Sequence, residues 1–261
     1  MSPSSSIRVA GLGYTYPGYA VPALAEVSFE VAPGEVVAVL GPSGAGKTTL
    51  FRCLTQLVDP DEGTVELAGR RPAELDGREL RLARREVGLI FQQFNLVRRL
   101  TAQGNVLAGR LGHLSTWRVL LRRFPAADRE LAGVCLARVG LSDQADQRAD
   151  RLSGGQQQRV AIARVLAQQS SLVLADEPVA SLDPETATSV LDILRDVARE
   201  RDITVLSSLH QIDLATRFAD RVLGLRAGRL VVDKPAEAFD DTDYGLIFAS
   251  PTPAPPSGTP A

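Results

Sequence analysis

The stretch EVVAVLGPSGAGKTTLFRCLTQL at residues 35–57 constrains the fold of this chain more than any other stretch. An unbroken apolar run comes first, a glycine-rich turn follows it, and a helical pattern begins directly after the turn. Apolar runs without polar alternation are typical of strands buried on both faces, as in a parallel sheet. The stretch therefore predicts a strand, a tight turn and a helix that belong to an α/β fold.

Further apolar runs and helical patterns repeat this arrangement along the chain. Apolar runs occupy residues 87–91, 171–176 and 203–209, and helical patterns occupy residues 153–169 and 184–202. Pro184 stands at the start of the last helix, where the first turn does not need its missing N–H group. We therefore expect a parallel sheet whose strands are joined by right-handed helical crossovers.

Two regions differ from this pattern because their apolar residues alternate with polar residues and turns. They are residues 7–33 and residues 220–233. Alternation indicates antiparallel strands, and Ala227 and Gly228 are expected to form the turn of a hairpin in the second region.

The remaining segments set the domain organisation. Residues 96–152 contain no strand pattern and predict an inserted helical subdomain. The last 13 residues are rich in proline and lack apolar periodicity. We place one domain at residues 7–248, and we expect residues 1–6 and 249–261 to be disordered.

Charge and cysteine usage narrow the classes of function. The chain has 31 acidic and 29 basic side chains, and its net charge of −2 argues against a nucleic-acid partner. Cys53 and Cys135 have no metal-ligand spacing, and we expect both to be reduced and structural. No apolar run is long enough to span a membrane, and the first residues lack a signal-peptide pattern. The sequence predicts a protein that stays in the cytosol.

The glycine-rich turn after the first apolar run has the spacing G-x-x-x-x-G-K-T of a phosphate-binding loop. Its glycines let successive N–H groups converge on a phosphate, and Lys47 supplies a charge for the β and γ oxygens. The hydroxyl group of Thr48 is a candidate ligand of Mg²⁺. We predict nucleotide binding by Gly41, Pro42, Ser43, Gly44, Ala45, Gly46, Lys47, Thr48 and Thr49.

Two adjacent carboxylates follow the apolar run at residues 171–176. Asp176 and Glu177 point to opposite sides because neighbouring strand residues alternate. We expect Asp176 to hold Mg²⁺, directly or through water, and Glu177 to polarise the attacking water as a general base.

Three further residues are candidates for the same site. His210 and Gln92 each follow an apolar run, at the sheet edge where parallel α/β sheets bind ligands. We expect His210 to act in catalysis and Gln92 to reach Mg²⁺ or the attacking water. Tyr16 is a candidate platform for a nucleotide base, since stacking needs only an exposed ring face.

A second candidate anion site begins the helix at residues 153–169. Ser153 and Gln156 have the spacing of a capping box, and Gly154 and Gly155 leave the backbone N–H groups uncovered. The chain thus has two phosphate-binding features, and the residues alone leave open which phosphate the second one meets.

The motifs GPSGAGKT, FQQ, LSGGQQQR, LVLADEP, SLD and LH resemble those of the nucleotide-binding subunits of ATP-binding cassette (ABC) transporters in order and spacing. The resemblance covers about residues 7–235. It implies a P-loop NTPase (RecA-like) core, an antiparallel β subdomain and an inserted helical subdomain. It also implies that Tyr16 stacks on adenine and that Gln92 is the Q-loop residue. It assigns Ser153, Gly154, Gly155 and Gln156 to the signature, Ser181 and Asp183 to the D-loop, and His210 to the switch histidine.

The resemblance further implies an assembly. Two copies pair head to tail, and each ATP lies between one chain's phosphate loop and the other chain's signature. The dimer would dock on two membrane permease subunits, at the cytoplasmic face of the membrane, and an extracytoplasmic binding protein would select the ligand.

Residues 90–125 resemble the ATPase subunits of phosphonate importers most closely, and Trp117 lies in their distinctive segment. Trp117 is interpreted either as a packing anchor or as a partner contact. The chain departs from that family at Arg98 or Arg99, at Gly104, and at the SSL sequence before His210.

Other functions remain open on the sequence. Within transport, the substrate could be phosphite, phosphate, an amino acid or an exported compound. An ABC ATPase that acts on nucleic acid or the ribosome is an alternative, but this chain has one cassette and no long coiled coil. A P-loop kinase would have no use for LSGGQ.

Overall fold

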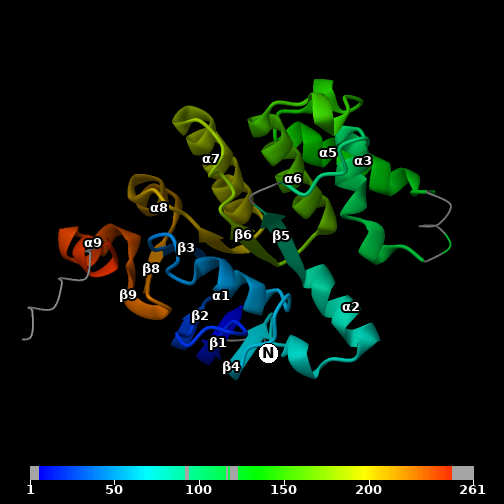
Figure 1. Cartoon of the computed structure of the whole chain (residues 1–261). Helices are drawn as coiled ribbons and strands as arrows, with labels where there is room; N and C mark the ends of the chain where they lie inside the picture. Colours follow the sequence, from blue (N-terminus) through cyan, green and yellow to red (C-terminus); the bar gives the residue numbers. More distant parts are fainter. Residues whose placement is uncertain (1–5, 92–93, 116, 118–122, 249–261) are drawn as a thin grey trace, which may run out of the picture.

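The apolar runs of the sequence form one mixed, largely parallel sheet, as predicted (Figure 1). The computed structural model describes residues 6–91, 94–115, 117 and 123–248. Neighbouring strands follow the order β5-β6-β7-β3-β8-β9, and all pairs are parallel except the last. The strands are β3 (Val36–Leu40), β5 (Val87–Phe91), β6 (Leu172–Asp176), β7 (Thr204–Ser208), β8 (Arg221–Arg226) and β9 (Arg229–Pro235).

Strand β3 shows why these runs are continuously apolar. Val37 and Val39 pack into one buried cluster, whereas Val36, Ala38 and Leu40 pack into another on the opposite face. Successive side chains of a strand alternate between faces, so a strand covered on both sides needs apolar residues throughout.

An antiparallel sheet covers one face of this core, in the order β2-β1-β4. It contains β1 (Ile7–Tyr14), β2 (Leu24–Val31) and β4 (Glu62–Leu67). The pairing of β1 with β2 was predicted, but β4 was not. The hairpin of β8 and β9 turns at Ala227 and Gly228 as predicted, and both residues have positive φ, as a type I′ turn requires.

Most helices pack on the other face, whereas Leu50, Phe51 and Leu54 of the helix after β3 pack on the face that the antiparallel sheet covers (Figure 1). The predicted helices are α1 (Lys47–Leu54), α6 (Gly154–Gln168) and α7 (Pro184–Glu200). The others with assigned bounds are α2 (Gly77–Glu86), α3 (Ala102–Ala108), α5 (Ala126–Arg138), α8 (Ile212–Phe218) and α9 (Asp241–Phe248). Short 3₁₀ turns are η1 (Pro72–Glu74), η2 (Leu111–His113), η3 (Ser142–Gln144), η4 (Ala149–Arg151) and η5 (Ala236–Ala238).

The inserted subdomain is helical, as expected. Helices α3 and α5 pack against α6, and the described part of residues 96–152 contains no strand. Trp117 has 74% of its surface exposed, which excludes its interpretation as a packing anchor.

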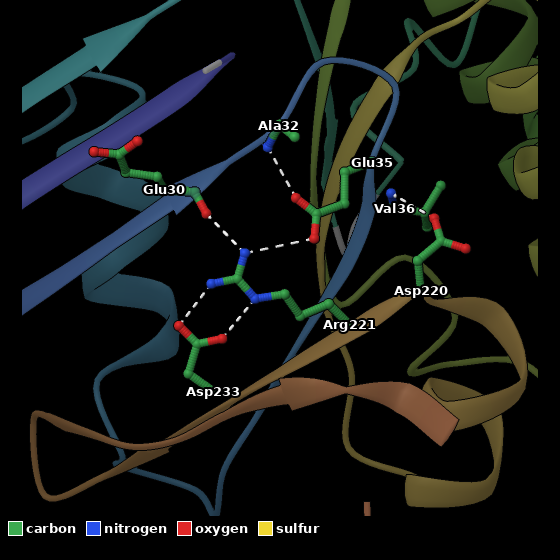
Figure 2. Close-up of polar contacts among 7 residues, drawn as sticks. All are labelled: Glu30, Ala32, Glu35, Val36, Asp220, Arg221 and Asp233. Atoms are coloured by element: carbon green, nitrogen blue, oxygen red, sulfur yellow. Dashed lines mark hydrogen bonds and ion pairs between the residues drawn. The ribbon is translucent and has the colours of Figure 1, made fainter. Parts of the chain in front are cut away.

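Arg221 joins the antiparallel sheet to the core sheet (Figure 2). Its guanidinium group donates two hydrogen bonds to Asp233 on β9 and one to the carbonyl of Glu30 on β2. It also pairs with Glu35, which accepts the N–H of Ala32. The hydrogen bond to the Glu30 carbonyl therefore links the two sheets, and the bidentate ion pair with Asp233, within the core sheet, holds the guanidinium group in place for it.

An ion pair inside the helical subdomain supports a stability prediction. Arg110 donates to Asp128 at 2.9 Å, and the two side chains are only 13% and 11% exposed. Asp128→Ala would leave the guanidinium group without its carboxylate, so we expect a loss of about 3 kcal/mol in the free energy of unfolding. Glu200→Ala, which breaks the more exposed pair with Arg138, is the control and should cost under about 1 kcal/mol. Urea unfolding measures both, and equal losses would contradict the prediction.

Candidate functional site

The phosphate loop between β3 and α1 has a backbone path that excludes larger residues. Gly44 and Gly46 have φ of +80° and +106°. A Cβ atom on Gly46 would lie 2.6 Å from the carbonyl oxygen of Ala23, and one on Gly41 would lie 2.5 Å from that of Leu225. Left-handed φ and close backbone contacts both select glycine. The structure therefore confirms the predicted tight, glycine-dependent turn between the strand and the helix, and phosphate binding by the loop stays a prediction.

Lys47 is almost fully buried beside this loop. Its ammonium group donates to the carbonyl oxygens of Gly41 at 2.6 Å and Pro42 at 3.2 Å. Burial lowers the pKa of Lys47, and the carboxylates of Glu177 and Asp176 oppose that shift. The ammonium group of Lys47 is thus held against the loop backbone by two hydrogen bonds, and the charges of Glu177 and Asp176 act on it.

Asp176 ends β6, and its carboxylate is held by a neighbouring strand. The hydroxyl group of Ser208 donates to Oδ1 of Asp176 at 2.7 Å. Burial raises the pKa of Asp176, whereas the hydrogen bond from Ser208 and the charge of Lys47 lower it. The charge of Glu177 adds to the effect of burial, so the pKa of Asp176 lies above its ordinary value and these two partners offset the shift only in part.

Glu177 leaves the strand with a strained backbone. Its φ is +49°, a left-handed conformation that costs about 1–3 kcal/mol for a residue other than glycine. Oε1 of Glu177 lies 2.5 Å from Nε2 of His210. The strained turn therefore places Glu177 against the histidine that follows the neighbouring strand β7.

One cavity of about 390 Å³ brings together most of the residues predicted for the chain's own nucleotide site, although Gly41, Pro42 and Asp176 do not line it. Its lining consists of Tyr16, Ala23, Ser43, Gly44, Ala45, Gly46, Lys47, Thr48, Thr49, Glu177 and His210. The hydroxyl group of Tyr16 is within 3.2 Å of Thr49 Oγ1 and accepts a hydrogen bond from Arg52. A basic loop, a carboxylate and an aromatic ring thus share one opening, which suits a nucleotide with its phosphates.

The second anion feature lies apart from this cavity. Ser153 and Gln156 form the predicted capping box, with hydrogen bonds of 3.3 and 2.9 Å. A Cβ atom on Gly155 would lie 2.4 Å from Thr186 Cγ2, so packing also requires this glycine. Asp183 caps α7 by accepting the N–H of Thr186. None of the signature or D-loop residues lines the cavity of the same chain.

The comparisons with known proteins decide the family. The sequence model described as ABC transporter matches residues 24–180. The chain belongs to the ABC transporter family. A curated relative in Rhodopseudomonas palustris, named phosphonates import ATP-binding protein PhnC 1, is 50% identical over 83% of this chain and 78% of its own length. The protein of the same name in Ruegeria sp. is 44% identical over 93% and 94%. The hypophosphite import ATP-binding protein HtxD of Stutzerimonas stutzeri is 48% identical over 92% and 70%.

Solved structures of ABC proteins share this fold. The dimeric ABC transporter cassette MJ0796 matches with a TM-score of 0.77 and 33% identity, over 89% of this chain and all of that chain. A second structure of MJ0796, in a post-hydrolysis state with ADP and phosphate, has a TM-score of 0.75. CbiO1 of Clostridium perfringens matches with a TM-score of 0.80 and 26% identity, over 93% of each chain. The predicted P-loop NTPase fold with its ABC subdomains is confirmed, and the chain is an ABC ATPase that binds ATP.

Other sequence predictions for this ABC ATPase have different outcomes. Gln92 lies outside the described residues. No described helix is both long and apolar enough to cross a bilayer. The described ranges also hold no group of three His, Cys, Asp or Glu side chains arranged for a metal ion. The predicted Mg²⁺ site has only one carboxylate and one hydroxyl group from the protein, with nucleotide phosphates as further ligands, so it would not form such a group of three. The prediction of Mg²⁺ binding therefore stays a prediction.

Sequence reasoning missed Ser208, the residue that contacts both Asp176 and Glu177. One signal was available, since a hydroxyl residue ends an apolar strand at the edge where α/β sheets bind ligands.

Proposed function

We propose that this ABC ATPase powers the import of phosphonates. The observation that carries the proposal is the identity of 44–50% to phosphonate import ATP-binding proteins over most of the chain. The distinctive segment around Trp117 supports the same substrate class, and its exposed ring suits contact with a partner.

Residues of the cavity divide the work of ATP hydrolysis. Tyr16 stacks on adenine, the loop at residues 41–49 holds the phosphates through its N–H groups, and Lys47 neutralises the β and γ oxygens. Thr48, Asp176 and Gln92 would hold Mg²⁺, which would neutralise charge on the phosphates. The short set of protein oxygens suits an ion that keeps waters and phosphates as its other ligands.

Glu177 accepts the proton of the attacking water, and His210 fixes its carboxylate. The 2.5 Å contact between the two side chains supports this pairing. General bases contribute about 10²- to 10⁴-fold to such reactions.

The signature residues complete the site of a second copy. Their absence from the cavity of their own chain supports a head-to-tail dimer. In this dimer Ser153 and Gly154 face the γ-phosphate bound by the partner. The D-loop residues Ser181 and Asp183 lie at the same interface. Two charge-assisted contacts in each of two sites amount to about 6–12 kcal/mol gross. A shift from 1% to 99% closed needs about 5.5 kcal/mol of differential binding, which this gross contact energy exceeds.

A groove of about 510 Å³ between α2, β5 and α6 suits docking of a permease segment. Apolar residues such as Leu80, Leu89 and Phe91 line it, together with several arginines. A helix of the permease would lay its apolar face there, with the subunit at the cytoplasmic side of the membrane. Arg98, Arg99 and Gly104 do not line this groove, so their departures from the phosphonate family leave its described lining unchanged.

Reconstitution tests the substrate. The ATPase should be incorporated in lipid vesicles with its two permease subunits and the cognate binding protein. ATP hydrolysis should rise several-fold when an alkylphosphonate is added with the binding protein, because the loaded binding protein favours the closed dimer. Phosphate, phosphite, hypophosphite and glutamine are the comparison ligands. A rise with hypophosphite alone would transfer the proposal to the substrate named for the Stutzerimonas relative, and a rise with phosphate or glutamine alone would refute it.

A further inference from the structure

Ser208 is the last residue of β7, and its side chain has no exposed surface. Its hydroxyl group donates to Oδ1 of Asp176 at 2.7 Å and accepts the backbone N–H of Glu177 at 2.8 Å. A hydroxyl group has only one donor, and here it is used on a carboxylate. The single oxygen atom thus contacts both acidic residues of the site.

Strand register explains how one side chain reaches both residues. Asp176 and Ser208 are paired across β6 and β7. Glu177 comes one residue later, where its positive φ turns the chain away from the strand. The hydroxyl group of Ser208 takes up the Glu177 N–H at this turn, and the turn delivers the Glu177 side chain to His210.

Ser207, the preceding residue, gives an internal comparison. It is equally buried, but it points to the opposite face of β7 and its hydroxyl group has no hydrogen-bond partner among the described residues. Two equally buried, adjacent serines therefore differ in the face they point to and in their hydrogen bonds, and those of the Ser208 hydroxyl group are both to residues of the site.

We propose that Ser208 is a positioning residue for ATP hydrolysis. Its hydroxyl group orients the carboxylate of Asp176 and holds the backbone turn that aims Glu177. The inference rests on the proposed roles of Asp176 and Glu177. Without the hydroxyl group, the Glu177 N–H loses its partner and the Asp176 carboxylate can rotate, so the catalytic step suffers while the phosphate loop still binds nucleotide.

The experiment compares Ser208→Ala with Ser207→Ala, the matched control. Steady-state hydrolysis gives kcat and KM. A fluorescent ATP analogue gives the Kd of nucleotide in EDTA and the gain in affinity when Mg²⁺ is added. Ser208→Ala should lower kcat about 10- to 100-fold, since small displacements of reacting groups have effects of this size. Its Kd in EDTA should stay within about twofold of wild type while the Mg²⁺-dependent gain shrinks, because only the carboxylates are displaced.

Two conservative variants separate positioning from folding. Ser208→Thr keeps the hydroxyl group and should restore most of kcat. Ser208→Cys keeps a side chain of the same shape, slightly larger, that hydrogen-bonds weakly, so it should show the same loss as Ser208→Ala and leaves no cavity if the alanine variant fails to fold.

The variant Asp176→Asn distinguishes a failure of the inference about Ser208 from a failure of the proposed function. If that variant hydrolyses ATP normally, the proposed role of Asp176 is wrong. If Asp176→Asn is inactive but Ser208→Ala and Ser208→Cys match Ser207→Ala, the inference about Ser208 alone is wrong. A rise of Kd in EDTA in parallel with the loss of kcat would also overturn it.

Discussion

Glu177→Gln should lower kcat for ATP hydrolysis by about 10²- to 10⁴-fold and leave ATP affinity nearly unchanged. An amide has the shape of the carboxylate and can still contact His210, but it cannot accept the proton of the attacking water. Glu177 lines the same cavity as the phosphate loop, and among the described residues its carboxylate makes no hydrogen bond to the loop, so the substitution leaves the loop's own contacts unchanged. Phosphate release at saturating ATP measures the effect.

Glu237→Gln is a suitable control, because Glu237 is exposed on η5. This substitution removes the same negative charge at a position away from the cavity. It should keep full turnover. Near wild-type turnover of Glu177→Gln would show that another group accepts the proton.

The second large effect concerns the signature. Gly154→Asp would put a carboxylate at the helix N-terminus that is proposed to face the partner's γ-phosphate, and like charges would prevent closure. The position is better suited than Gly155, since a Cβ atom at Gly154 meets only Leu182 Cδ2 at 3.3 Å, whereas at Gly155 it meets Thr186 at 2.4 Å. Hydrolysis by Gly154→Asp should fall by about 100-fold or more. Lys47→Ala, which removes the phosphate-loop charge, should be comparably inactive.

Mixing the two inactive variants tests whether sites are shared. A dimer of one Lys47→Ala chain and one Gly154→Asp chain contains one intact site, made of the phosphate loop of the second chain and the signature of the first. Random pairing should therefore recover up to about a quarter of wild-type turnover. A mixture of Lys47→Ala with the double variant has no intact site and is the control. Absence of recovery in the first mixture would contradict shared sites that work independently of each other.

Local features of this fold were predictable from the sequence, and features that depend on tertiary register were not. Strand β3 was recognisable because both of its faces are buried, which leaves an uninterrupted apolar run. Strand β4 has an exposed, polar first half and no such signal, so it was missed. It becomes a strand because it pairs with β1 at the edge of the antiparallel sheet.

The same division holds within the site. The capping box of Ser153 and Gln156 involves residues three apart, so its spacing could be read directly. The contact of Ser208 with Asp176 joins residues 32 positions apart and depends on how β6 and β7 align. Gly155 was interpreted as uncovering N–H groups, and the structure adds a steric reason, its contact with Thr186, that only the packing of α7 reveals.

Two copies of this ABC ATPase are proposed to enclose ATP between them. Sedimentation of Glu177→Gln measures this most directly, because the variant should bind ATP without consuming it. Without nucleotide, the 27.9 kDa chain should sediment as a monomer. With ATP and Mg²⁺ it should sediment at about twice that mass, and addition of Gly154→Asp to the same chain should abolish the change. A Glu177→Gln chain that binds ATP and still sediments as a monomer would contradict the shared site.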